Sequence, residues 1–266
     1  MLGARGALTG SPARFWPAVV RFFTESFPVA AYRAWPWWTG VGLACIAVAA
    51  WLMAHYAGHP EDALRFLSQD EIDQLVTTSF EAYYRQAAPQ NFAFQVWTNN
   101  ALVSAICLAS GVLIAPVLLV LFYNFWNVGI TGGIMIGNGR GDVFFGLLLV
   151  HGMLELTCIF VAAGVGLRIG WSWIAPGPLR TRGQAVAEAA RSGMVVALGL
   201  AAVLLVSGVI EGFVTPYVPT VVALPIGAAA WLGFLGYVVV LGRPAAQAGL
   251  TGDLAVDERE AQAPTG

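Results

Sequence analysis

The chain has 266 residues and is nearly neutral, with 58% hydrophobic residues and only 11% charged ones. So few polar residues cannot cover a soluble globule of this length, and much of the apolar surface must face lipid. A net charge of −2 also lacks the basic surplus of a nucleic-acid-binding protein, so no nucleic-acid partner is expected. The composition predicts an all-α fold, a polytopic bundle of transmembrane helices with the lipid bilayer as its first partner.

Residues 1–35 are predicted to form an amphipathic segment at the cytoplasmic surface of the membrane. Pro17, Glu25 and Pro28 interrupt its apolar stretch, and no signal-peptide cleavage site follows. The side chains expected to lie in the interface are Phe15, Trp16, Val19, Val20, Phe22, Phe23 and Phe27, with Arg14, Arg21 and Arg33 as anchors.

Residues 36–245 are predicted to form the transmembrane domain. It contains five windows that are almost free of charge and long enough for a helix to cross a hydrocarbon core about 30 Å thick. These windows are 39–57, 99–123, 143–167, 193–214 and 218–241. The remaining residues, 246–266, are polar and acidic without periodicity, and we expect a disordered tail.

The main extramembrane loop is expected at residues 55–95, between the first two windows. It carries the acidic residues Glu61, Asp62, Asp70, Glu71, Asp73 and Glu81. Because short cytoplasmic segments are enriched in Arg and Lys, this acidic loop is predicted to lie outside and the Arg-bearing N-terminus in the cytoplasm.

The number of crossings is five or six, depending on the run from residue 96 to residue 137. Five crossings would place the loop with Arg168, Arg180 and Arg182 outside, against the charge rule. Two crossings by this run, with a break near Pro116, return that loop to the cytoplasm, so six spans fit the charges better. Several glycines in the second half favour a broken or re-entrant segment: Gly129, Gly132, Gly133 and Gly137.

Ionisable residues at membrane depth are expensive and mark candidate sites. His151 and Glu155 are four residues apart, so they share one face of a helix. Glu211 ends a later span, and the adjacent Asn99 and Asn100 open the second one. These five residues are predicted to form a polar core inside the bundle.

Three interpretations of this polar core remain open. It could fix the bundle by interhelical hydrogen bonds, each worth about 1 kcal/mol. It could carry protons or ions in a transporter or channel. Finally, His151, Glu155 and Glu211 could hold zinc in a metal-dependent intramembrane enzyme, although the two-histidine helix motif of zinc proteases is missing. No catalytic residue and no cofactor is predicted.

The order of several motifs resembles the stage II sporulation protein M family over residues 95–220. The motifs are Asn99-Asn100, the glycine run 127–133, His151-Gly152-Met153-Leu154-Glu155-Leu156, Gly166-Leu167-Arg168, Pro176-Gly177 with Arg180 or Arg182, and Ile210-Glu211-Gly212-Phe213-Val214-Thr215-Pro216. Val150 stands where the family usually has proline. The resemblance implies a multispanning membrane protein, which in spore formers joins peptidoglycan-degrading enzymes in a complex during engulfment.

From this resemblance we expect a non-enzymatic protein of the cell membrane that organises or recruits cell-envelope, peptidoglycan-related machinery. The engulfment role itself is not carried over, because no residue shows that the organism sporulates. Expected partners are other membrane or cell-envelope proteins, met through the loop 55–95 or through a cytoplasmic docking region at Arg168, Arg180 and Arg182. A homodimer is a further option.

Overall fold

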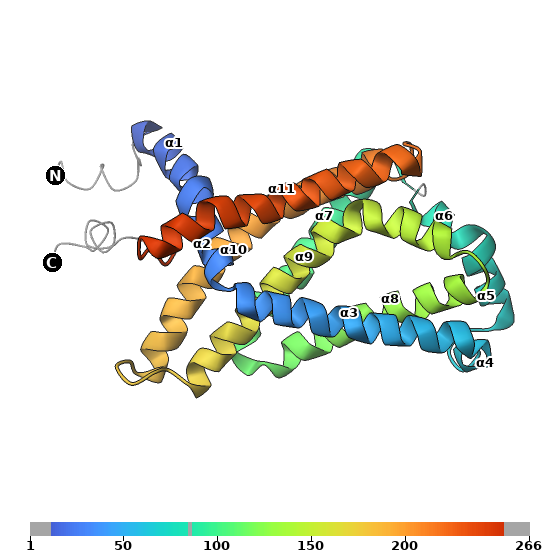
Figure 1. The fold of residues 1–266 in the computed structure, drawn as a ribbon, viewed down its shortest axis with the longest axis horizontal. Helices are drawn as coiled ribbons and strands as arrows, with labels where there is room; N and C mark the ends of the chain where they lie inside the picture. The colour runs from blue at the N-terminus through green and yellow to red at the C-terminus, as the bar shows by residue number, and fades with distance from the viewer. Residues whose placement is uncertain (1–11, 85–86, 253–266) are drawn as a thin grey trace, which may run out of the picture.

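The computed structural model describes residues 12–84 and 87–252, which form a bundle of long α-helices (Figure 1). In this part of the chain, six helices are long and apolar enough, by length and composition, to cross a membrane. They are α3 (Trp35–Gly58), α7 (Pro89–Ala109), α8 (Ala115–Gly137), α9 (Gly141–Ile174), α10 (Arg182–Val209) and α11 (Thr220–Gln247). The all-α polytopic bundle is therefore confirmed, with the six helices that the charge pattern favoured.

A tight turn between α7 and α8 lets the long apolar run form two helices. The turn contains a short 3-10 helix (Gly111–Leu113) and Ile114, whose φ of 59° is rare for a β-branched residue. A Cβ on Gly111 would lie 2.4 Å from the carbonyl oxygen of Gly166 in α9, so only glycine fits there. The chain breaks next to Pro116, where the sequence predicted the break.

The glycine-rich second half of this run is neither broken nor re-entrant, and that expectation is wrong. The four glycines lie in the continuous helix α8 and face α3. A Cβ on Gly129 would lie 2.6 Å from Cβ of Leu52, and one on Gly133 would lie 2.6 Å from Cβ of Tyr56. The glycines are thus needed for close contact between two membrane helices.

The N-terminal segment is only partly a surface element. It consists of α1 (Pro12–Arg21), a π-helical turn (Phe22–Ser26) and α2 (Phe27–Arg33). Phe15 and Trp16 are exposed, but Phe27 is 1% exposed and packs against Phe234 of α11. The prediction that Phe27 lies in the membrane interface is wrong. Helix α2 crosses α10 at Gly199 (Figure 1), and the Phe27 ring lies so close there that a Cβ on Gly199 would clash with it. Residues 1–11 and the Arg14 side chain lie outside the described part.

The extramembrane segment between α3 and α7 comprises residues 59–88, which fall within the expected loop 55–95. Its described elements are α4 (Pro60–Ala63), α5 (Gln69–Gln74), a π-helical turn (Leu75–Ser79) and α6 (Phe80–Tyr83). A capping box starts α5, in which the amide N–H of Ser68 donates to Glu71 Oε2 over 2.7 Å. The hydrogen bonds from the backbone and side chain of Ser68 lower the pKa of the Glu71 carboxyl. An ion pair between Glu81 and Arg140 ties the segment to the start of α9.

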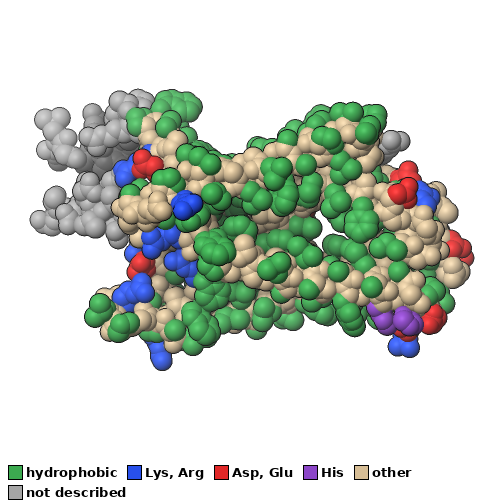
Figure 2. All heavy atoms as spheres, viewed as in Figure 1, with side chains coloured by type: hydrophobic (Ala, Val, Ile, Leu, Met, Phe, Trp, Pro, Cys, Tyr) green, Lys and Arg blue, Asp and Glu red, His purple; other side chains and the backbone are tan. Residues whose placement is uncertain are grey.

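The charged side chains gather at the two ends of the bundle (Figure 2). One end, formed by α2 and the loop between α9 and α10, is rich in arginine. The opposite end, formed by residues 59–88, is mainly acidic, and the sides between the ends are apolar. Helix α11 continues to Gln247, two residues into the predicted tail, and residues 253–266 lie outside the described part. This segregation gives each end of the bundle its own chemistry.

Candidate functional site

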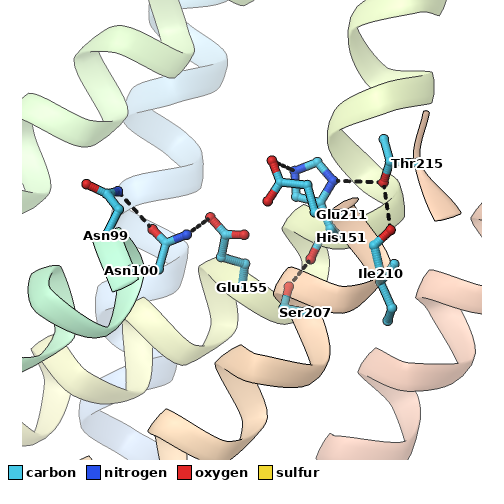
Figure 3. A network of polar contacts seen from close by, with 8 residues as sticks. All are labelled: Asn99, Asn100, His151, Glu155, Ser207, Ile210, Glu211 and Thr215. Atoms are coloured by element: carbon cyan, nitrogen blue, oxygen red, sulfur yellow. Dashed lines mark hydrogen bonds and ion pairs between the residues drawn. The ribbon is translucent and has the colours of Figure 1, made fainter. Parts of the chain in front are cut away.

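Helix α9 carries the first two residues of a buried polar cluster, His151 and Glu155 (Figure 3). His151 lies ten residues after Gly141, or about 15 Å along the helix axis, so it is deep in the bundle. It is 4% exposed, and Glu155, one turn further on, is half-buried. The spacing of four residues does place both side chains on the same face of the helix.

The end of α10 brings the third ionisable residue to the cluster. Glu211 lies in a π-helical turn (Ile210–Val214), and its Oε1 is 3.6 Å from Nε2 of His151. On the other side of the imidazole, Oγ1 of Thr215 is 3.4 Å from Nδ1. Ser207 in α10 donates to the carbonyl oxygen of His151 over 3.3 Å. Single π-helical turns often mark functional positions, and this one directs Glu211 inward.

Helix α7 supplies the amide that holds Glu155. Nδ2 of Asn100 donates to Glu155 Oε1 over 2.7 Å, and Asn100 is buried. The neighbouring Asn99 is exposed, and its Nδ2 lies 3.5 Å from Oδ1 of Asn100. The structure thus brings Asn100, His151, Glu155 and Glu211 together and leaves Asn99 at the rim.

Close contact between α7 and α10 encloses this side of the cluster. A Cβ on Gly212 would lie 2.7 Å from the carbonyl oxygen of Pro89, and one on Gly208 would lie 2.9 Å from that of Ala93. Glycine at both positions allows the two backbones to touch.

The cluster has unused hydrogen-bonding capacity. Within the described part of the chain, Oε2 of Glu155, Oε2 of Glu211 and Oγ of Ser104 are buried without a hydrogen-bond partner. One ligand atom each from His151, Glu155 and Glu211 lies within 4.8 Å of the other two. Because an uncompensated buried charge is costly, a proton or a cation must neutralise these carboxyl groups. An imidazole and two carboxylates, with a position left open, also suit zinc.

Comparison with known proteins identifies the family. The profile described as Stage II sporulation protein M matches residues 39–216, which is more than half of the chain. The chain belongs to the stage II sporulation protein M family. The matched range runs from α3 to just beyond the π-helical turn, and it contains every residue of the polar cluster. No curated protein and no solved structure matches the chain.

Tyr84, a tyrosine from the extramembrane segment, covers the polar cluster. Tyr84 is 6% exposed, and its ring centroid lies 5.8 Å from that of His151. Burial raises the pKa of the Tyr84 phenol well above its usual range. Tyr84 therefore separates the cluster from the acidic end of the bundle as a neutral, largely apolar cover.

Three residues of the cluster escaped sequence reasoning, namely Ser207, Thr215 and Tyr84, although helical spacing points to the first two. Ser207 and Thr215 lie four residues before and after Glu211. A search for polar residues at this spacing would have found them. Tyr84 has no such relation, because it lies in an irregular segment whose position depends on tertiary packing.

The three arginines predicted as a docking region lie at the other end of the bundle and do not join the cluster. Arg168 and Arg180 line the same cavity, which has a volume of about 210 Å³. Arg182 lies outside it, with its guanidinium carbon 5.9 Å from the centroid of the Trp173 ring. The region therefore divides into a cavity with two of the arginines and a separate stacked arginine.

Proposed function

We propose that this multi-pass membrane protein is a non-enzymatic organiser that recruits cell-envelope machinery through its extramembrane segment. The observation that carries this proposal is apolar surface on residues 59–88. Leu64, Phe66 and Tyr83 are 49%, 58% and 47% exposed, although they lie outside the six apolar helices. A partner protein would bury these side chains, because exposed apolar groups on extramembrane elements are typical of interaction sites.

A cavity beside the same segment offers a place for such a partner. It has a volume of about 460 Å³ and lies between the segment and α8. Its lining combines apolar groups, such as Phe66 and Trp126, with polar ones, such as Asn127 and Glu71. Mixed linings of this kind suit a protein partner with both apolar anchors and hydrogen-bonding groups.

The segment is fixed to the bundle and can therefore present a defined surface. Tyr84 anchors it on the polar cluster, Glu81 pairs with Arg140, and Nε2 of His55 lies 3.0 Å from Oδ2 of Asp62. In this proposal the polar cluster supports the segment from below and performs no reaction. A rigid surface loses little conformational entropy on binding, which favours recruitment.

We further propose that the acidic end lies outside and the N-terminus in the cytoplasm, as the arginine-rich opposite end favours. The three cysteines, Cys45, Cys107 and Cys158, are buried, so an added surface cysteine can be labelled selectively. In intact cells, a membrane-impermeant maleimide should label Thr78→Cys but not Leu179→Cys. Labelling of only the second variant would reverse the orientation.

Recruitment can be tested by placing a photo-reactive amino acid at Phe66 in cells. The proposal predicts crosslinks to a cell-envelope protein, with a peptidoglycan-degrading enzyme as the expected class from the family. The same amino acid at Leu119, which is exposed on the side of α8, serves as control and should not capture that protein. Crosslinks at Phe66 to a second copy of the chain would indicate a homodimer, and crosslinks to lipid alone would contradict recruitment.

A second candidate function follows from the buried His151, Glu155 and Glu211. Their convergence and the two unpartnered Oε2 atoms favour a divalent cation, which could activate a water molecule at an open position. Metal content measured by inductively coupled plasma mass spectrometry tests this candidate on purified wild type and on His151→Ala. About one zinc per chain, lost in the folded variant, would support a metal site. Absence of metal from both would leave the organiser proposal.

A further inference from the structure

The arginine-rich end of the bundle contains a polar cavity that the organiser role does not use. It lies where the end of α2, the start of α3, the end of α9 and the start of α10 meet, and its volume is about 210 Å³. The charged groups that line it are Arg33, Arg168, Arg180 and Glu188. This set has more positive than negative charge, as Figure 2 shows for this end of the molecule.

Arg168 is the residue that most requires an anion. Arg168 is half-buried, and no hydrogen bond or ion pair joins its guanidinium to another described residue. Its electrostatic neighbours are two like charges, Arg33 and Arg180, and one carboxylate, Glu188. Among the described residues of the lining the one carboxylate is Glu188, which is already paired with Arg180 at 2.8 Å. A half-buried cation among like charges is costly unless an anion enters the cavity.

The guanidinium groups specify the chemistry of that anion. Arginine presents a planar set of N–H donors, which matches the oxygens of a phosphate group in a bidentate fashion. Arg33 uses Nη1 to donate to the carbonyl oxygen of Leu250, at 3.1 Å, and has further donors available. The cavity therefore suits a phosphate group.

A second observation extends the site toward the membrane interior. An apolar groove of about 520 Å³ runs between α3 and α8 and shares Trp37 with the polar cavity. Leu167, next to Arg168, also lines this groove. Along α3 the lining runs from Pro36 to Val48, or about 18 Å, which is roughly the depth of one leaflet. An acyl chain fits such a groove, whereas a free phosphate would leave it empty.

Two tryptophans mark the junction between the cavity and the groove. The ring centroids of Trp37 and Trp171 are 6.2 Å apart, and both residues line the polar cavity. Tryptophan is enriched where the headgroups of a bilayer meet its hydrocarbon core. The polar cavity thus lies at headgroup level, with the groove below it in the hydrocarbon.

We propose that this end of the protein holds one anionic phospholipid. Its phosphate binds Arg168, Arg33 and Arg180 in the polar cavity, and one acyl chain lies along α3 in the groove. This assignment goes beyond the recruitment role at the opposite end, and it makes Arg168 and Arg180 lipid ligands instead of a docking point for a protein.

Native mass spectrometry of the full chain in detergent tests the proposal, with added phosphatidylglycerol, phosphatidylcholine or inorganic phosphate. Phosphatidylglycerol should bind with a stoichiometry of one and more tightly than phosphatidylcholine. Arg168→Gln should weaken this binding about tenfold, because one charge-assisted contact is lost. Arg182→Gln is the matched control, since Arg182 lies at the same end but outside the cavity, and it should bind as wild type does.

Two further variants keep the test decisive if Arg168→Gln does not fold. Glu188→Gln removes the carboxylate of the cavity and frees Arg180, so phosphatidylglycerol should bind about threefold more tightly. Gly40→Leu fills the groove where a Cβ meets nothing within 4 Å, and it should weaken binding at least about fivefold. Gly233→Leu, in equally open space on α11, is its control.

Three results would overturn the proposal. Equal loss of binding in Arg168→Gln and Arg182→Gln would indicate diffuse attraction at this end of the bundle. Unchanged binding in both Glu188→Gln and Gly40→Leu would place the lipid elsewhere. Binding of inorganic phosphate without preference for phosphatidylglycerol would show that the cavity takes a free anion.

Discussion

Asn100 in α7 and Glu155 in α9 are joined inside the bundle by a hydrogen bond of 2.7 Å between Nδ2 and Oε1. The bond connects two helices inside the bundle, and the Asn100 side chain that donates it is buried. It also leaves Oε2 of Glu155 free beside His151 and Glu211. One amide therefore fixes the orientation of a carboxyl group on which the remaining cluster depends.

Replacement of Asn100 should destabilise the bundle, because the Glu155 carboxyl then loses its hydrogen-bond donor. We expect Asn100→Ala to lower the free energy of unfolding by about 1–3 kcal/mol. Asn99→Ala is the matched control, since this neighbour is exposed, and its effect should stay within about 0.5 kcal/mol. Unfolding by sodium dodecyl sulfate in mixed micelles measures both. Equal effects of the two variants would mean that the hydrogen bond contributes nothing.

The contact between α3 and α8 should be sensitive to a single methyl group. In Gly133→Ala the added Cβ would lie 2.6 Å from Cβ of Tyr56, so the helices must separate, at a cost of about 1–3 kcal/mol. Gly236→Ala adds the same methyl group in open space and should be neutral or stabilising by up to about 1 kcal/mol. Thermal unfolding in detergent compares the two. A neutral Gly133→Ala would show that the helices are not held at this distance.

The sequence predicted the features of the fold that follow from the difference between water and lipid. It did not predict the features that depend on contacts between helices. Hydropathy identified five apolar windows, and the distribution of arginines favoured a sixth span. One window, 99–123, straddles the turn between α7 and α8. The glycines near Gly133 suit either a broken helix or a close contact, and only the position of α3 distinguishes the two. Burial of Phe27 likewise depends on space left by Gly199 in a distant helix. Composition alone contains no information on which glycine faces which side chain of another helix.

The candidate site shows the same division between local and tertiary information. Helical spacing placed His151 and Glu155 on one face, since a period of 3.6 residues is local geometry. Their meeting with Glu211 requires α10 to return beside α9. The cover by Tyr84 requires the segment 59–88 to fold back over the cluster. Neither relation can be calculated from residue spacing.

Ionisation of Tyr84 should destabilise the protein at high pH. The pKa of its phenol is raised in the folded state, so the neutral form is favoured there, whereas the unfolded chain ionises near pH 10. Its contribution to stability is therefore complete below about pH 10 and is lost as the pH rises further. Unfolding free energies at about pH 8 and pH 11 should differ less in Tyr84→Phe than in wild type. Tyr217→Phe, at an exposed position, should behave as wild type.

Neutral replacement of Glu155 should separate a structural cluster from a metal site. In the organiser proposal the carboxyl groups are neutralised by protons, and Glu155→Gln keeps a carbonyl acceptor for Asn100. We then expect Glu155→Gln to remain within about 1 kcal/mol of wild type, while Glu155→Ala costs about 2–4 kcal/mol. The chelator EDTA should leave the unfolding temperature of wild type unchanged. A bound cation would reverse these results, because its affinity contributes directly to stability. EDTA and Glu155→Gln would then each lower the unfolding temperature by a similar amount. EDTA would cause no further decrease in Glu155→Gln.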